Sequence, residues 1–318
     1  MLVINKMKTL LVTGGSGLIG NAIHNLINDY PSYSFIFVSS KQYDLRIMDE
    51  TRNMFETYKP DLVIHLASNV GGLYKNMNNK VEMLEDNLLI NYNIVKCSYK
   101  YKVQKLIACL STCIYRFDVI AYPIKENQLH DGPPHNSNDS YAYAKRMLDI
   151  HCKSYRDNYG SNFMCIIPTN VYGPYDNFNL ENGHVLPSLI NKCFLARKND
   201  SSFEIKGTGA PLRQFIFSYD IAKLIMVVLD NDIKDNIILS VPEKDEISIG
   251  DVGKIIAKCF DYDNRIIFDS TSSDGQYKKT VSNDKIQQYV KDFEFTKIED
   301  GIKQTIDWFL LNEDKRRI

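Results

Sequence analysis

Two side chains suited to proton transfer stand four residues apart in the stretch "SYAYAKRMLD": Tyr141 and Lys145. This spacing predicts that both lie on one face of a helix. An ammonium group near a phenol favours the phenolate, so we expect the pKa of Tyr141 to fall below its usual value of about 10. A phenol tuned in this way gives or takes a proton near neutral pH, as the reduction of a carbonyl group requires.

The stretch "STCIY", residues 111–115, places further reactive side chains at the end of a hydrophobic run. Ser111 stands thirty residues before Tyr141 and would polarise the same carbonyl group. Cys113 lies two residues further on, and a continuing extended backbone would send its side chain to the same side as that of Ser111. A cysteine at a strand end is most often a small buried apolar residue, so the thiol by itself indicates no chemistry.

A glycine-rich turn near the start of the chain predicts a phosphate-binding site. The stretch "TGGSGLIG" follows the first predicted strand and contains both a GxxGxxG and a GxGxxG pattern. Glycines let the backbone approach a pyrophosphate, and the N-terminus of the next helix supplies N–H donors. The competing interpretation is a turn that holds no ligand. The residues expected to hold the dinucleotide here are Gly14, Gly15, Ser16, Gly17, Leu18, Ile19 and Gly20.

The residues after the second predicted strand distinguish between the two nicotinamide dinucleotides. Sites for NAD usually have an acidic residue there, which accepts a hydrogen bond from the ribose 2′-hydroxyl. In this chain Ser39, Ser40 and Lys41 occupy the end of the strand, and the first carboxylate is Asp44. Hydroxyl groups and an ammonium suit a 2′-phosphate, so we expect NADP, held in part by Ser40 and Lys41. An ordinary polar loop is the alternative.

The hydrophobic segments alternate between strand-like and helix-like patterns through the first half of the chain. Strands are predicted at 9–14, 34–39, 62–67, 105–111 and 163–169. Helices are predicted near 18–29, 49–58, 80–101 and 140–159. The alternation indicates crossover units and a parallel sheet that is covered on both faces. We therefore expect an α/β fold, a doubly wound parallel sheet of the Rossmann type with a smaller mixed α/β lobe.

The regular alternation breaks down after Pro174. Later helices are expected at 218–230, near 248–260 and near 296–311, with strands at 237–241 and in "RIIF". We expect the chain to return to the sheet at 214–241. The predicted domains are a dinucleotide-binding domain of residues 1–174 and 214–245, and a substrate lobe of residues 175–213 and 246–318.

The composition restricts the class of partner. The net charge is -1, from 38 basic and 39 acidic residues without a basic block, so we expect no nucleic-acid partner. We expect no membrane association either, because no apolar run is long enough for a span and the start lacks the features of a signal peptide. The seven cysteines are scattered without metal-ligand spacing. We therefore expect a reduced, cytoplasmic protein with no bound metal.

These stretches together resemble the GDP-L-fucose synthase family, a group of extended short-chain dehydrogenases/reductases. The resemblance runs from residue 9 to about residue 283. It implies an NADPH-dependent enzyme that epimerises GDP-4-keto-6-deoxy-D-mannose at C3 and C5 and then reduces it at C4 to GDP-L-fucose. The stretches that carry the resemblance are "VTGGSGLIG", "VIHLAS", "VGGLYKN", "CLSTCIY", "HDGPPHNSN", "YAYAKRM", "IPTNVYGPYDNFN", "GHVLP", "RQFI" and "SDGQYKKT".

The resemblance also implies roles for single residues. The reductase triad would be Ser111, Tyr141 and Lys145. Cys113 and His184 would be the acid/base pair of the epimerisations, with a thiol pKa of about 8.5 lowered by positive neighbours and a histidine pKa near about 6.5. The cofactor would also contact Lys145, Pro168, Thr169, Asn170, Val171 and His184. The substrate would contact Lys192, Lys206, Arg213, Asp274 and Lys279, and the helices near 80–101 and 140–159 would form a homodimer surface.

The chain departs from the family pattern at two places, and other functions stay open. Lys206 stands where the family usually has an aromatic residue, and "RFDVIA", beginning at Arg116, replaces a segment that tends to contain proline. The nearest alternative function is a 4-epimerase or a 4,6-dehydratase of the same superfamily. A non-catalytic NADP-binding module is the second alternative, although its expected mark is a broken triad and all three triad residues are present.

Overall fold

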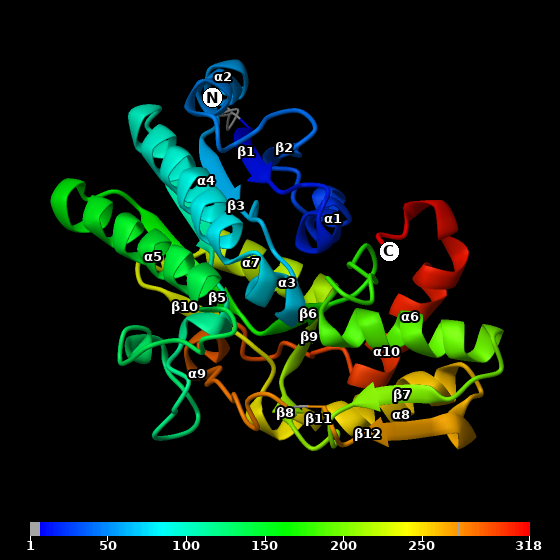
Figure 1. Ribbon diagram of the computed structural model, residues 1–318. Helices are drawn as coiled ribbons and strands as arrows, with labels where there is room; N and C mark the ends of the chain where they lie inside the picture. The colour runs from blue at the N-terminus through cyan, green and yellow to red at the C-terminus, as the bar shows by residue number, and fades with distance from the viewer. Residues whose placement is uncertain (1–6, 273) are drawn as a thin grey trace.

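A six-stranded parallel sheet forms the centre of the computed structural model, which describes residues 7–272 and 274–318 (Figure 1). The strand order is β10-β5-β4-β3-β1-β2, and every neighbouring pair runs parallel. The chain reverses its winding direction between β1 and β3, the point at which doubly wound sheets bind ligands. The strands are β1 (Lys8–Thr13), β2 (Tyr33–Val38), β3 (Leu62–His65), β4 (Lys105–Cys109), β5 (Phe163–Pro168) and β10 (Ile237–Leu239).

Helices cover both faces of the sheet and bury one hydrophobic cluster on each side. The helices on the first face are α2 (Met48–Tyr58), α4 (Lys80–Lys100) and α5 (Asp139–Tyr159). The helices on the second face are α1 (Leu18–His24), α7 (Ser218–Asp230) and the short α9 (Asp284–Gln287). Because both faces are covered, the central strands β3, β4 and β5 are buried along their whole length.

A third hydrophobic cluster holds a second group of elements together, which Figure 1 shows below and to the right of the main sheet. The helices of this lobe are α6 (Val185–Lys198), α8 (Ile249–Cys259) and α10 (Ile298–Leu311). Its strands form two-stranded sheets: β6 (Asn170–Tyr172) with β9 (Phe215–Phe217), β7 (Phe203–Lys206) with β12 (Ile266–Asp269), and β8 (Leu212–Arg213) with β11 (Ile247–Ser248). A further short helix, α3 (Leu73–Asn78), precedes α4.

The predicted fold class is confirmed, with local corrections. Helix α1 ends at His24 and is followed by a 3-10 turn, so the prediction of one helix over 18–29 is wrong in its second half. Strand β4 ends at Cys109, because the chain turns at Ser111. Helices α3 and α6 and strand β7 were not predicted. The domain boundaries remain a prediction.

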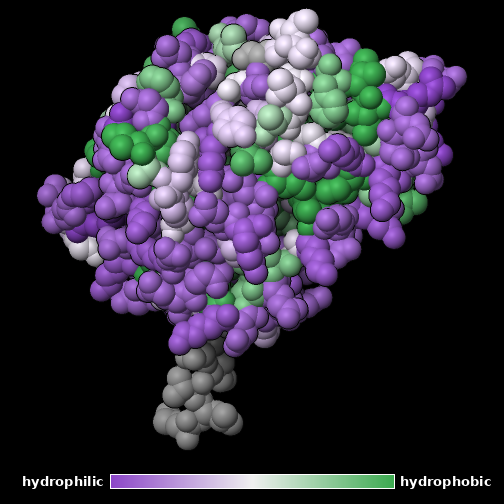
Figure 2. Space-filling model, turned by 90° about the horizontal axis from the view of Figure 1, so that it is seen from below, coloured by the Kyte–Doolittle hydropathy of each residue, from purple (hydrophilic) through white to green (hydrophobic). Residues whose placement is uncertain are grey.

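The surface gives no sign of a membrane-spanning element in the described part of the chain: none of its helices is long and apolar enough to cross a bilayer. The face of the molecule shown in Figure 2 is mainly hydrophilic, with hydrophobic side chains gathered in separate patches.

Lys105 is a buried lysine that ties the sheet to α7. It lies at the start of β4 and is 5% exposed. Its Nζ lies 2.5 Å from the carbonyl oxygen of Val228 and 2.6 Å from that of Asn231. Val228 lies in the last turn of α7 and Asn231 is its C-cap residue, where the helix itself offers no N–H donors. The ammonium therefore caps α7 and fixes it against the sheet.

We expect Lys105→Met to lower the free energy of unfolding measurably. The variant leaves buried carbonyl groups without donors, which costs about 1–3 kcal/mol for a buried polar group. Urea denaturation followed by circular dichroism measures the difference. Lys303→Met on the exposed side of α10 is the control and should change the free energy of unfolding little. Equal stability of the two variants would show that the ammonium does not cap α7.

Candidate active site

The glycine-rich turn before α1 is packed so closely that some of its positions accept only glycine. Gly14 has a φ of 70°, and a Cβ there would lie 2.8 Å from the backbone nitrogen of Ala67. A Cβ at Gly20 would lie 2.6 Å from the carbonyl oxygen of Gly14. Only glycine fits these positions without displacement of backbone, so the turn stays tight. The N–H groups of Gly15 and Gly17 donate to the carbonyl oxygens of Val38 and Gly14, and the first N–H groups of α1 have no partner within the helix. This cradle fits the pyrophosphate of a dinucleotide.

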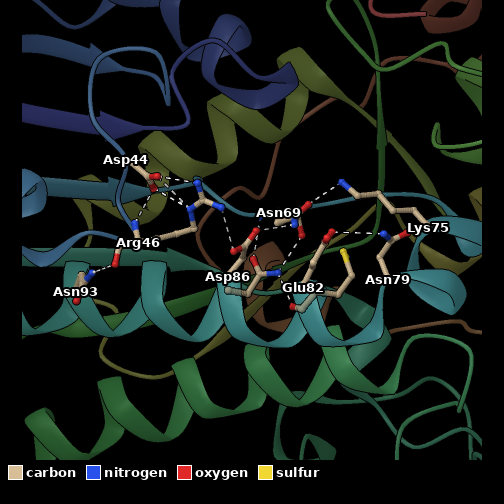
Figure 3. Close-up of polar contacts among 10 residues, drawn as sticks. Asp44, Arg46, Asn69, Lys75, Asn79, Glu82, Asp86 and Asn93 are labelled. Carbon is tan, nitrogen blue, oxygen red and sulfur yellow. Dashed lines mark hydrogen bonds and ion pairs between the residues drawn. The ribbon is translucent and has the colours of Figure 1, made fainter.

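The first carboxylate after β2 is already engaged. Oδ2 of Asp44 lies 2.7 Å from Nη2 of Arg46, and Nη1 of Arg46 lies 3.2 Å from Asp86 on α4 (Figure 3). Figure 3 also shows that this network continues along α4 to the loop before α3. Ser40 and Lys41 are exposed beside it. An acidic group that is bound to arginine accepts poorly from a ribose hydroxyl, so this geometry favours the 2′-phosphate of NADP.

A buried hydroxyl group points to a ligand at the end of β5. Pro168 is the last residue of β5, and Asn170 and Val171 belong to β6. Thr169, between them, is buried, and its Oγ1 has no hydrogen-bond partner in the described part of the chain. Buried hydroxyls in native proteins are nearly always paired. The four residues therefore fit a group that binds at this edge of the sheet, as the nicotinamide would.

Ser111 and Cys113 meet in a 3-10 turn, Thr112–Ile114, that follows β4. The backbone N–H of Cys113 donates to Oγ of Ser111 over 3.4 Å. The prediction that a continuing extended strand aligns the two side chains is wrong, because the turn brings them together instead. Cys113 is 9% exposed, so its thiol lies among packed side chains.

Tyr141 and Lys145 lie in α5, and both are buried. Nζ of Lys145 lies 5.6 Å from the centre of the Tyr141 ring and donates to the carbonyl oxygen of Cys109 at 2.7 Å. The predicted fall in the pKa of Tyr141 is wrong. Burial raises the pKa of the phenol well above its usual value, and the nearby Cys113 and Cys109 raise it further. The loss of hydration disfavours the phenolate, and only a hydrogen bond with Ser68 opposes this effect on the pKa.

Lys279 is the main positive charge acting on the Cys113 thiol. Burial raises the pKa of Cys113, and Lys279 opposes this effect more than Ser111 or Lys145 does. The expected net decrease of the thiol pKa is therefore wrong, since burial outweighs the cations. Burial also lowers the pKa of Lys279 to about 8, with a smaller contribution from Arg213 in the same direction. Cys113, Lys279 and Arg213 are thus electrostatic neighbours.

Two hydrogen-bonded chain segments hold Arg213 and Lys279 in place. Nη2 of Arg213 donates to the carbonyl oxygen of Gln276 at 2.7 Å. The backbone N–H of Val281 donates to Oε1 of Gln214 at 2.8 Å. The two cations predicted to bind substrate therefore come from adjacent, mutually bonded segments of the chain.

His184 is the N-cap residue of α6. The protein around the ring lowers the pKa of the imidazole by desolvation, and the charge of Arg317 lowers it further. The residue is nevertheless exposed to solvent on one side. His184 therefore has a pKa that is shifted down from the value near about 6.5 that the sequence suggested. Its charged neighbour Arg317 was not among the predicted site residues.

Lys192 and Lys206 lie together with Tyr74, an aromatic residue that the sequence analysis missed. Nζ of Lys206 lies 3.1 Å from the hydroxyl oxygen of Tyr74 and 5.0 Å from the centre of its ring. Burial lowers the pKa of Lys192, and both Lys206 and Tyr74 influence it. Tyr74 thus places a ring beside the position where the family pattern has an aromatic residue. The position of this ring depends on a tertiary contact between α3 and β7, so the sequence alone did not reveal it.

Asp274 shapes the turn that follows Lys206. Its two carboxylate oxygens accept from the backbone N–H and the hydroxyl of Thr208, each at 2.7 Å. Gly207 has a φ of 83°, and a Cβ there would lie 2.3 Å from Oδ1 of Asp274. The structure therefore gives Asp274 a local role, and its contact with substrate remains a prediction.

The parallel sheet, the glycine cradle and the buried Tyr141 and Lys145 on α5 define a dinucleotide-dependent oxidoreductase of the Rossmann type. The chain belongs to the NAD dependent epimerase/dehydratase family, which matches residues 10–241.

Relatives of known name cover nearly the whole chain. A GDP-L-fucose synthase of Dictyostelium discoideum is 47% identical over 313 residues, with 98% of each chain covered. A probable GDP-L-fucose synthase of Drosophila melanogaster is 41% identical over 98% of this chain and 100% of its own. The crystal structure of a GDP-L-fucose synthetase from Naegleria fowleri bound to NADP matches with a TM-score of 0.93 and 45% identity, over 98% of this chain and 96% of that one.

We expect Lys279→Met to slow alkylation of Cys113 by iodoacetamide near pH 7. The ammonium favours the thiolate, so its loss raises the thiol pKa, and a rise of one unit lowers the thiolate fraction about tenfold. Lys279 itself loses its charge as the pH rises through about 8. The difference between variant and wild type should therefore shrink above that pH. Site-resolved mass spectrometry over a pH series measures the rate.

The neighbouring Lys278 supplies the control. Its Nζ lies 3.2 Å from Glu243, so Lys278→Met removes a cation that is engaged elsewhere. The exposed Cys259 serves as an internal reference thiol. If Lys279→Met and Lys278→Met leave Cys113 equally reactive, Lys279 does not act on the thiol.

Proposed function

We propose that the protein is an NADPH-dependent epimerase-reductase that converts GDP-4-keto-6-deoxy-D-mannose to GDP-L-fucose. The observation that carries the proposal is a buried thiol beside the proposed reductase triad: Cys113 shares a turn with Ser111 and influences the pKa of Tyr141. This group combines donors for a carbonyl oxygen with a base for the adjacent carbon. The similarity to GDP-L-fucose synthases over 98% of the chain supports this choice of substrate.

The raised pKa of Tyr141 suits the role of a donor. The ketone at C4 makes the hydrogens at C3 and C5 acidic, because the enolate formed on their removal carries its charge on the C4 oxygen. Ser111 and a protonated Tyr141 would donate to that oxygen both during epimerisation and during reduction. Lys145 is fixed beside the phenol by the Cys109 carbonyl. The glycine cradle and Thr169 would hold NADPH, which when bound supplies the hydride for C4.

The two epimerisations need a base and an acid on opposite faces of the sugar. Cys113, assisted by the charge of Lys279, would remove the proton from carbon. His184, carried by the lobe rather than by the sheet, would deliver a proton from the other face. Lys192, Lys206 and Arg213 would bind the diphosphate of the substrate, since Arg and Lys are the usual partners of phosphate oxygens.

The identity of the product tests the proposal. Purified protein is incubated with GDP-4-keto-6-deoxy-D-mannose and NADPH, and the sugar nucleotide is analysed by NMR. We expect GDP-L-fucose with one NADPH oxidised for each product molecule. A 4-epimerase or a 4,6-dehydratase restores its cofactor in each turnover, so activity without net NADPH oxidation would favour those functions.

We expect Cys113→Ser to abolish proton exchange on carbon. Wild-type protein in heavy water without NADPH should introduce deuterium at C3 and C5 of the keto-sugar. The variant keeps the size of the side chain but offers a hydroxyl that is far too weak an acid to form the required base at neutral pH. Cys259→Ser, at an exposed thiol, should exchange like the wild type. Exchange by Cys113→Ser at the wild-type rate would mean that Cys113 only packs.

The protein is further proposed to be a homodimer. Helices α4 and α5 pack side by side (Figure 1), and both expose apolar side chains at helical spacing. Contiguous exposed apolar surface of this kind marks association sites. The exposed side chains are Val81, Leu89, Tyr92 and Tyr99 on α4, and Tyr143, Met147, Ile150 and Tyr159 on α5. The seven unpaired thiols support a reducing location, which we propose is the cytoplasm.

Light scattering should give twice the mass of the chain, because in a dimer each copy would cover the exposed apolar side chains on α4 and α5 of the other. Leu89→Glu combined with Met147→Glu places charges in the proposed contact and should give the mass of one chain. Leu311→Glu is the control, since Leu311 is 83% exposed on α10, outside the α4–α5 pair. A dimer that survives the double substitution would rule out this surface.

A further inference from the structure

Arg317 holds the start of the loop that carries His184 from outside. Asn191 and Gly72 also donate to this loop, to the carbonyl oxygens of Phe178 and Asn182. The backbone N–H of Phe178 donates to the carbonyl oxygen of Arg317 at 2.7 Å, and Asn177 forms a parallel β-bridge with Arg317. The Arg317 guanidinium donates to the carbonyl oxygen of Tyr175. Both the backbone and the side chain of Arg317 therefore bind the start of the loop.

The carbonyl group that accepts from Arg317 belongs to a residue with an unfavourable backbone conformation. Tyr175 has a φ of 67°, in the left-handed region that residues with a side chain seldom adopt. Its ring packs 4.6 Å from that of Trp308 in α10. The bond from Arg317 and this ring contact fix the direction in which the loop leaves β6.

A series of side-chain hydrogen bonds transmits that direction to His184. Oδ1 of Asn177 accepts from the backbone N–H of Asn179 at 3.1 Å, and Oδ1 of Asn179 accepts from that of Asn182 at 2.8 Å. The carbonyl oxygen of Asn179 accepts from the N–H of Gly183 at 3.0 Å. His184 follows directly as the N-cap of α6. Hydrogen bonds within the loop thus connect residue 177 to 179, and residue 179 to both 182 and 183.

The charge of Arg317 also reaches the imidazole. A cavity of about 430 Å³ beside the loop is lined by Lys75, Asn177, Asn182 and Arg317, among others. The charged groups on the elements around the loop include Lys75 on α3, Asp176 and Glu181 on the loop, and Arg317. Arg317 also opposes the effect of burial on the pKa of Asp176, which burial raises to about 7. Lys75 is held by Oδ1 of Asn69 at 2.6 Å, and Arg317 is the charge that shifts the pKa of His184.

We propose that Arg317 is a positioning residue for the epimerisation: it orients His184 through the loop from residue 175 to residue 183. The inference rests on the proposed function, because it gives His184 a place in the proton transfers. It also links two parts of the chain that the sequence keeps far apart, since residue 317 lies outside every motif that indicated the site.

The test separates epimerisation from hydride transfer in the intact protein. Epimerisation is measured without NADPH, as formation of the sugar inverted at C3 and C5, over a pH series. Hydride transfer is measured in reverse, from GDP-L-fucose to saturating NADP⁺, which needs the triad but no epimerisation. The variants are Arg317→Gln and Arg317→Lys. Lys315→Gln, which removes the same charge from an exposed turn two residues earlier, is the control.

We expect Arg317→Gln to slow epimerisation about tenfold or more, since a misplacement of about 1 Å can cost about 10²-fold, while hydride transfer changes little. A positive neighbour disfavours the imidazolium, so its removal raises the pKa of His184. The limb of the epimerisation profile that falls with rising pH should therefore move to higher pH. Arg317→Lys keeps the charge and should restore the position of that limb, and Lys315→Gln should match the wild type.

Three outcomes would overturn the inference. These are an unchanged epimerisation rate in Arg317→Gln, an unchanged pH limb, or an equal loss of both half-reactions together with a lower melting temperature. The last of these would make Arg317 a purely structural residue. Failure of the wild-type protein to epimerise or to transfer hydride would instead reject the proposed function, so the two failures are distinguishable.

Discussion

A buried ammonium group organises the site. Lys145 is 2% exposed, and a buried charge is tolerated only when it has partners. Its hydrogen bond to the Cys109 carbonyl, at 2.7 Å, fixes the first half of α5 to the end of β4. The same charge acts on His65, whose pKa burial already lowers to about 3. That neutral ring then joins β1 to α4, with its two nitrogens 2.8 Å from Thr13 and 3.1 Å from Asn91.

Burial, rather than pairing with cations, sets the protonation states of the groups in the site. It raises the pKa of Tyr141 and of Cys113 and lowers that of Lys145 and of Lys279. A phenol that stays protonated is a dependable donor to a carbonyl oxygen, whereas a thiol that stays protonated is not a base. The two functions therefore place opposite demands on neighbouring buried groups. A cation beside the thiol but away from the phenol partly offsets the effect of burial on the thiol. Lys279 occupies that place.

The sequence predicted the elements whose signal is local, and it missed those that depend on tertiary contact. Strands β1 to β5 are continuous apolar runs, and the glycine turn has its own pattern, so both were found. Helix α6 was missed because its apolar residues face the lobe and no polar start signal precedes Val185. The pKa of Tyr141 was misjudged because the i,i+4 spacing reveals the neighbouring ammonium but not the depth of burial. The roles of the single site residues still rest on resemblance and geometry.

The base and the acid proposed for epimerisation come from different parts of the molecule, so their relation depends on how the lobe joins the sheet. Gln214, which is almost fully buried, makes that connection. Its Nε2 donates to the carbonyl oxygen of Val241, just beyond β10, at 2.9 Å, and to that of Val281 at 3.1 Å. Arg213 precedes Gln214, and Lys279 lies two residues before Val281. One buried amide therefore fixes both cations relative to the end of the sheet, where the thiol lies. A change in lobe packing would move the cations and the thiol apart, and the thiol would then lose the charge that opposes its burial.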